Sequence, residues 1–195
     1  ITISSPVLFL IFNRPETTEQ VFSAIRKAEP PRLYVAADGP RHDYPNDAES
    51  CEIVRTIATN VDWNCEVKTL FREKNLGCGL AVTSAIDWFF EQEDEGIILE
   101  DDTKPSEQFF KFINFGLKKY RDDKKIGSIC GYNPLNPKPE ENDKIIISNY
   151  PSLWGWGTWK RVWGNYSLKT DSNYLYKFKP IYRHIKHLRY TLYIL

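Results

Sequence analysis

The chain has 195 residues, with 26 basic and 26 acidic side chains and a formal net charge of zero. A chain of this length can bury a full core in one domain. Its balanced charge gives no general attraction to nucleic acid or to acidic membranes. No apolar run approaches the ~20 residues that span a bilayer. Four widely spaced cysteines predict free thiols rather than a disulfide framework or a metal–thiolate site: Cys51, Cys65, Cys78 and Cys130.

Strands and helices alternate along the chain. The apolar run at 7–12 predicts a strand that is buried on both faces, and the apolar spacing over 13–28 predicts a helix. This alternation is typical of βαβ units, so we expect an α/β fold with a mainly parallel central sheet flanked by helices. The Pro- and charge-rich segment 133–143 is predicted to be a loop that moves as a flap. The further predicted strands are 32–38, 65–71, 96–99, 126–131 and 144–148, and the further helices are 47–59, 82–90 and 105–120.

Polar residues follow each of the first four predicted strands. Ligands of open α/β sheets bind beyond the carboxyl ends of the strands, so these residues are candidates for a binding site. They are Asn13 and Arg14, then Asp38 and Gly39, then the loop from Asn75 through Gly77, and finally Glu100, Asp101 and Asp102.

The triplet Glu100, Asp101 and Asp102 is the clearest of these signals. Adjacent carboxylates repel one another unless a cation neutralises them, and Mg²⁺ and Mn²⁺ take oxygen ligands. The alternative is that the acids cap the following helix, where an acidic side chain gains ~0.3–1 kcal/mol from the helix dipole. A single acidic residue would be enough to cap that helix. Three adjacent acids therefore favour a divalent-cation site.

The other strand ends each allow two interpretations. Asn13 and Glu16 fit a capping box, which leaves Arg14 as a solvated charge or as a contact to a phosphate or a base. Asp38, followed by Gly39, fits an ordinary turn, or it accepts hydrogen bonds from a nucleobase.

Four tryptophans fall within ten residues: Trp154, Trp156, Trp159 and Trp163. They form either a local core beneath a loop or a platform on which sugar rings stack, with the glycines between them letting the backbone approach a ligand. Trp159 and Trp163 lie four residues apart on a predicted short helix, so we expect them in the core. Trp154 and Trp156 are expected in the wall of a pocket.

Five segments taken together resemble the GT-A fold glycosyltransferases. They are "LFLIFNRPETTEQVFSAIRK", "AADGPR", "REKNLGCG", "GIILEDDTKPSEQFFKF" and "YPSLWGWGTWKRVW". The resemblance is greatest to bacterial family 2-like sugar transferases, including hemolytic-protein-like members, and more distant to the inverting N-acetylglucosaminyltransferases of the Golgi. It covers most of the chain to about residue 165. It implies a nucleotide-diphosphate sugar donor (UDP-sugar favoured), Mn²⁺ or Mg²⁺, and a glycan or lipid-linked acceptor.

The resemblance also implies roles for individual residues. Asp102 would be the metal ligand, and Asp101 and Glu100 would hold the ribose and the donor sugar. Asp38 would contact the nucleobase, and Arg14 the base or the diphosphate. The remaining donor-binding residues would be Asn13, Asn75, Gly77 and Cys78, and the sugar and acceptor side would be lined by Trp154, Gly155 and Trp156.

The resemblance implies one GT-A domain over 1–195, with 1–102 as the nucleotide-binding half and 103–195 as the acceptor-side half. The expected reaction is direct displacement with inversion, in which a carboxylate takes a proton from the acceptor hydroxyl. Asp171 is the one carboxylate after the aromatic stretch, and it also fits a helix N-cap. We therefore expect the chain to be C-terminally truncated, with the base beyond Leu195. A cytoplasmic bacterial enzyme that builds surface glycans, with peripheral membrane association, is the expected setting.

Three other classes remain open. A nucleotidyltransferase acting on sugar phosphates would share the acidic metal site, but it carries a Gly-rich basic loop after its first strand, where this chain has "NRPETT". A non-catalytic carbohydrate-binding domain would use the tryptophans and would not need polar residues at four strand ends. A degenerate transferase acting as a scaffold would keep the same pattern.

Overall fold

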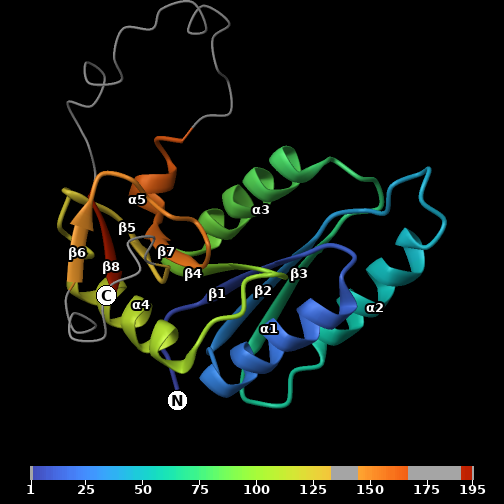
Figure 1. The fold of residues 1–195 in the computed structure, drawn as a ribbon, viewed down its shortest axis with the longest axis horizontal. Coiled ribbons are helices and arrows are strands. Elements are labelled where there is room, and N and C mark those ends of the chain that lie inside the picture. The colour runs from blue at the N-terminus through green and yellow to red at the C-terminus, as the bar shows by residue number, and fades with distance from the viewer. Residues whose placement is uncertain (1, 133–144, 167–189, 195) are drawn as a thin grey trace, which may run out of the picture.

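The computed structural model describes residues 2–132 and 145–166, and the backbone of 190–194. The described residues form a mixed α/β fold around an eight-stranded sheet with the order β3-β2-β1-β4-β7-β5-β8-β6 (Figure 1). The strands are β1 (Val7–Ile11), β2 (Arg32–Ala37), β3 (Glu66–Phe71), β4 (Glu95–Glu100), β5 (Ile126–Cys130), β6 (Ile145–Ser148), β7 (Trp156–Trp159) and β8 (Tyr190–Ile194). The helices are α1 (Pro15–Ala28), α2 (Asp47–Thr59), α3 (Cys78–Gln92), α4 (Glu107–Lys119) and α5 (Lys160–Trp163).

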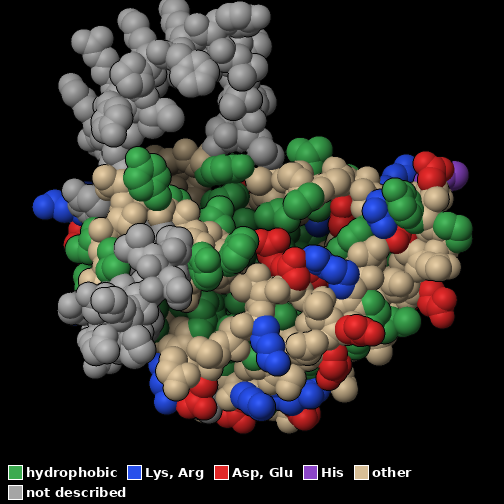
Figure 2. Space-filling model, in the orientation of Figure 1, with side chains coloured by type: hydrophobic (Ala, Val, Ile, Leu, Met, Phe, Trp, Pro, Cys, Tyr) green, Lys and Arg blue, Asp and Glu red, His purple; other side chains and the backbone are tan. Residues whose placement is uncertain are grey.

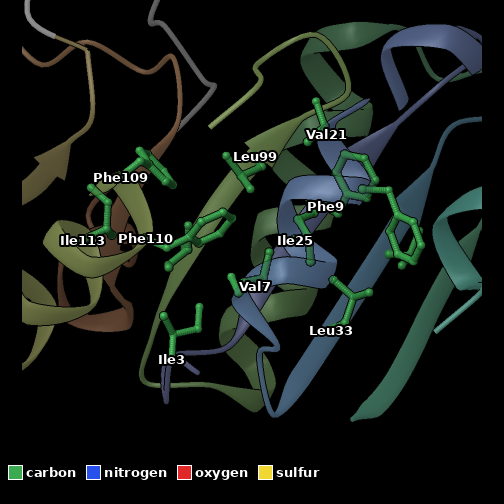
Figure 3. Packing of buried hydrophobic residues seen from close by; sticks show 14 of the residues in the cluster. Ile3, Val7, Phe9, Val21, Ile25, Leu33, Leu99, Phe109, Phe110 and Ile113 are labelled. Carbon is green, nitrogen blue, oxygen red and sulfur yellow. The ribbon is translucent and has the colours of Figure 1, made fainter. Parts of the chain in front are cut away.

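The central strands are buried on both faces, as the apolar runs predict. All five residues of β1 are buried, and successive side chains point to opposite faces of the sheet. Val7 and Phe9 pack in the cluster under α1, α2 and α4, whereas Leu8 and Leu10 pack in the cluster under α3. Figure 3 shows Phe9 in the first of these clusters, beside residues of α1. Helices therefore cover both faces of the sheet, which leaves the ends of the strands as the places where a ligand can reach it.

Strands β3, β2, β1 and β4 are mutually parallel. Their registers pair Ile11 with Ala37, Ala37 with Phe71, and Leu10 with Glu100. The carboxyl ends of four strands thus meet at one edge of the sheet, and the polar residues that follow them come together there. The predicted α/β fold with a mainly parallel sheet flanked by helices is confirmed.

The other half of the sheet contains two strands that the sequence did not predict. β7 lies antiparallel between β4 and β5, and β8 lies parallel to β5 and antiparallel to β6. Trp159 is in the core as expected, and its indole donates to the carbonyl of Leu117 at 3.1 Å. Trp159 ends β7 and is also the N-cap of α5, whose last residue is Trp163, so the predicted short helix is present but begins one residue later. Trp163 is partly buried, and its indole donates to Asp87 at 2.7 Å.

The predicted flap at 133–143 lies almost entirely outside the described residues, as does Asp171. Among the helices that the structure describes, we find none that combines the length and the apolar character needed to cross a membrane.

Candidate functional site

A hollow of about 360 Å³ opens at the carboxyl ends of β1, β2 and β4. We call it the central hollow. It brings together Arg14, Asp38, Asn75, Gly77, Cys78, Glu100 and Asp101, which come from four separate segments of the chain. Figure 2 shows acidic and basic side chains in contact near the middle of the visible face, next to a group of hydrophobic side chains. A larger hollow of about 460 Å³ lies between α1 and α4, and none of the predicted site residues lines it.

Arg14 bridges two of the three adjacent acids. Its Nη1 donates to Asp102 Oδ2 at 2.8 Å, and its Nη2 donates to Asp101 Oδ1. These contacts join residues 87 and 88 positions apart in sequence. The guanidinium is therefore the cation that balances the acidic cluster in this structure.

The acids differ in their surroundings. The Asp101 side chain is only 3% exposed, and its Oδ2 accepts the backbone N–H of Phe12 at 3.1 Å. Burial raises the pKa of Asp101, and the bonds from Arg14 and Phe12 only partly offset this rise. Glu100 is half-buried, and burial together with the negative charges of Asp102 and Asp101 raises its pKa. Asp102 remains 47% exposed and is thus the carboxylate most open to an incoming ligand.

Asp38 organises the loop that forms one wall of the central hollow. Its carboxylate is buried and accepts the backbone N–H groups of Leu76 at 3.0 Å and of Gly77 at 3.1 Å. It also accepts the N–H of Gly39 at 2.9 Å. The sequence left Asp38 as a turn residue or as an acceptor for a nucleobase, and the structure shows that three backbone N–H groups already engage its carboxylate.

The same loop is locked by Asn75 and leads into α3. Asn75 Nδ2 donates to the carbonyl of Gly39 at 2.8 Å, and its Oδ1 accepts the N–H of Gly77 at 3.1 Å. Gly77 has a φ of 76°, a backbone conformation that residues with a Cβ rarely adopt. Cys78 follows as the exposed first residue of α3. The first turn of a helix, with its unpaired N–H groups, therefore faces the central hollow.

Asn13 does not form the predicted capping box. The N-cap of α1 is Arg14, which makes no side-chain capping bond. The Asn13 amide instead donates to Asp47 Oδ1 at 2.7 Å. Asp47 is the first residue of α2, so this bond links the end of β1 to α2 instead of capping α1.

Asp47 also anchors Arg41, a residue of the central hollow that the sequence did not single out. Arg41 donates through Nε to Asp47 Oδ2 at 2.6 Å and through Nη2 to Oδ1 at 3.0 Å. These bonds lower the pKa of Asp47 from 3.8 to about 2. The guanidinium lies 3.6 Å from the ring centroid of Tyr44. Arg41 is the last residue of the segment "AADGPR", just after a predicted strand, and this position was the signal that could have identified it.

Arg72 is the second residue that the sequence did not single out. It directly follows β3 and lines the central hollow, and its Nη2 donates to Ser84 Oγ at 2.7 Å. Together with Arg14 and Arg41, it gives the hollow three guanidinium groups on different walls. Guanidinium groups are suited to bidentate contacts with phosphate oxygens.

A second hollow, of about 370 Å³, lies next to the acidic triplet. We call it the aromatic hollow, because Tyr132 and Trp154 line it with ring centroids 5.0 Å apart. Asp102 also lines it, so the two hollows share the acidic triplet. Trp154 is 65% exposed. Tyr132 was not among the predicted residues, because it falls between the predicted strand 126–131 and the predicted loop 133–143, where the sequence carries no periodic signal.

The other two residues of the Trp154–Trp156 segment lie deeper. Gly155 has a φ of 70°, and a Cβ there would lie 3.0 Å from the Phe109 ring. Trp156 is only 8% exposed and packs in the cluster under α3, and it lines neither the central nor the aromatic hollow. Trp156 begins β7, and the alternation of a strand turns its ring toward the core.

The donor set fits a divalent cation with few protein ligands. Among the described residues, no group of three or more acidic, histidine or cysteine side chains converges as a metal cage does. Asp102 nevertheless offers an exposed carboxylate whose present partner is a guanidinium, which shows that the position accepts a positive charge. Magnesium and manganese sites of this kind use one or two carboxylates and complete their coordination with phosphate oxygens and water.

Comparison with solved structures found distant similarities. No protein-family model matches the sequence, and no curated protein sequence matches it. The chain is similar to the mannosyltransferase PcManGT from Pyrobaculum calidifontis, solved in complex with GDP-Man and Mn²⁺, with a TM-score of 0.42 and 11% identity. The match covers 68% of this chain and 36% of that protein, so the chain spans about a third of its length.

Proposed function

We propose that this protein is a glycosyltransferase that takes a sugar from a nucleotide-diphosphate donor and passes it to a glycan or lipid-linked acceptor. One observation carries the proposal: two hollows share the acidic triplet, with Glu100 and Asp101 lining the central hollow and Asp102 lining the aromatic hollow. An inverting transferase can use this arrangement, because the acceptor hydroxyl must reach the anomeric carbon of the donor on the face opposite the bond to the leaving nucleoside diphosphate.

The central hollow supplies groups for a nucleoside diphosphate. Arg14, Arg41 and Arg72 can pair with phosphate oxygens, and the first turn of α3 presents backbone N–H groups. Asp38 and Asn75 hold the loop that would shape the nucleotide pocket. In this proposal the chain is one GT-A type domain, and the half up to residue 102 binds the donor, with a UDP-sugar favoured by the sequence resemblance.

Asp102 would hold Mn²⁺ or Mg²⁺, and Asp101 would be positioned next to it by Arg14 and the Phe12 amide. When bound, the cation would supply neutralisation of the diphosphate that leaves the sugar. Glu100, half-buried at the end of β4, would face the ribose or the donor sugar.

The aromatic hollow would receive the acceptor. The exposed rings of Trp154 and Tyr132 offer apolar faces on which sugar rings can stack. Inverting transfer requires a carboxylate that takes the proton of the acceptor hydroxyl. Asp171 remains our candidate for that base, and it lies outside the described residues.

Calorimetry with UDP and GDP, in the presence and absence of Mn²⁺, tests the proposal. We expect metal-dependent binding of one nucleotide that Asp102→Ala abolishes. Asp62→Ala, which removes an exposed aspartate paired with Arg26, is the matched control and should change nothing. Sugar binding without nucleotide binding would instead indicate a carbohydrate-binding domain. Release of pyrophosphate from UTP and a sugar 1-phosphate would indicate a nucleotidyltransferase.

A further inference from the structure

Arg14 holds two carboxylates that are very unequally bound to the rest of the protein. Asp101 is buried and has a second anchor in the backbone N–H of Phe12 at 3.1 Å. Asp102 is half-exposed, and its Oδ2 receives Arg14 Nη1 at 2.8 Å. Removing the partner of a buried carboxylate is costly, whereas exposed ion pairs contribute little to stability. The guanidinium can therefore leave Asp102 much more readily than it can leave Asp101.

The position that Arg14 occupies at Asp102 is also the position that a divalent cation would need. Nη1 occupies Oδ2 of Asp102, so a metal must either displace Nη1 from that oxygen or bind Oδ1 beside a positive charge that repels it. The displacement has a cost, because the freed side of the guanidinium loses its charged partner. Metal alone should therefore bind weakly.

A nucleoside diphosphate would remove that obstacle. Arg14 lines the central hollow, with Arg41 and Arg72 on other walls, so phosphate oxygens there would give the guanidinium a replacement for Asp102. Each ligand then makes the binding of the other more favourable, and such coupling is reciprocal.

We propose that Arg14 is a resident counter-cation that occupies Asp102 until a nucleoside diphosphate engages the guanidinium, so that the divalent cation and the nucleotide bind interdependently. The inference rests on the proposed function and concerns the control of its metal site. Arg14 acts here as a positioning residue for the carboxylates as well as a contact for the diphosphate.

Titration of the whole chain with Mn²⁺, followed by the electron paramagnetic resonance signal of the free ion, tests the inference without turnover. In the wild type we expect UDP or GDP to tighten Mn²⁺ binding more than about tenfold, within the range typical of coupled sites. Arg14→Gln should bind Mn²⁺ without nucleotide roughly five- to tenfold more tightly than the wild type, and its coupling ratio should be smaller. In the absence of metal, the same variant should bind the nucleotide more weakly.

Arg26→Gln is the matched control, because Arg26 lies on the same helix and also pairs with an aspartate, Asp62, at 3.1 Å. It should match the wild type in every titration, and Asp102→Asn should remove Mn²⁺ binding in every background. If Arg14→Gln fails to fold, Arg14→Lys replaces it. Its single nitrogen would stay with the buried Asp101 and free Asp102, so Mn²⁺ should again bind more tightly than to the wild type.

Unchanged or weaker Mn²⁺ affinity in a folded Arg14 variant without nucleotide would overturn the inference. The proposed function would stand in that case, provided that the wild type binds nucleotide with metal. If neither the wild type nor the variant binds Mn²⁺ under any condition, the inference and the metal dependence of the proposed function both fail.

Discussion

Asp38 accepts the backbone N–H of Gly77 through Oδ2 at 3.1 Å. This bond ties the end of β2 to the first turn of α3, across a gap of 39 residues in sequence. A buried carboxylate in this position is a structural clamp for the loop that walls the central hollow. The predictions that follow concern this clamp, the anchoring of Arg41, the charge of Glu100 and the two tryptophans of the Trp154–Trp156 segment.

Asp38→Asn should loosen the loop that walls the central hollow. The amide nitrogen would face backbone N–H groups, which leaves donors unpaired and should lower the free energy of unfolding by about 1–3 kcal/mol. Nucleotide affinity should fall as well, and urea unfolding and calorimetry measure the two effects. Asp43→Asn, at an exposed position in the segment between β2 and α2, should change neither. Wild-type stability in Asp38→Asn would contradict the clamp.

Asp47→Asn should remove a component of the acid sensitivity of folding. The folded pKa of Asp47 is lowered from 3.8 to about 2 by Arg41, so the stability it contributes is present above pH 4 and is lost as the pH falls toward 2. The stability difference between wild type and variant should therefore be largest above pH 4 and should shrink below it. Urea unfolding at several pH values measures this difference. Glu49→Gln, in the first turn of the same helix, should show no such trend.

Glu100→Gln should stabilise the protein at neutral pH. The folded pKa of Glu100 lies above its ordinary value of 4.5. The free energy of unfolding therefore falls as the pH rises from about 4.5 through the folded pKa. Glutamine removes the buried charge, and the variant should exceed the wild type in stability at pH 7 but not below pH 4. Loss of donor binding should accompany the gain. Glu19→Gln, at an exposed site on α1, should stay within about 0.5 kcal/mol at both pH values. A destabilised Glu100→Gln at pH 7 would show that the carboxylate is held by favourable contacts.

Trp154→Ala and Trp156→Ala should have opposite profiles. Trp154 is 65% exposed, so its loss should change stability by less than about 1 kcal/mol while weakening the binding of oligosaccharide probes. Trp156 is buried, so its truncation should cost about 3–5 kcal/mol. Urea unfolding and ligand-observed nuclear magnetic resonance distinguish the two effects. Equal stability losses in both variants would mean that Trp154 belongs to the core.

Local sequence patterns predicted the elements of the parallel half of the sheet well. The apolar run of β1 and the helical spacing of Val21, Phe22 and Ile25 depend only on residues close in sequence, and both elements occur within two residues of the expected bounds. The rule that carboxyl ends of parallel strands share one edge also predicted that the polar residues after these strands gather there, and Arg14, Asp38, Asn75, Glu100 and Asp101 indeed line one hollow.

The sequence by itself thus determined which elements form and which polar residues gather at the sheet edge, because periodicity and parallel pairing are local or generic. Only the tertiary structure decided the partners. Asn13 reaches Asp47 rather than capping α1, and Arg14 reaches Asp101 and Asp102 from 87 and 88 residues away. The same holds for β7, whose insertion between β4 and β5 turns Trp156 into the core. Such choices depend on which distant segments approach and which charges must be neutralised when they do, and no short stretch of sequence contains that information.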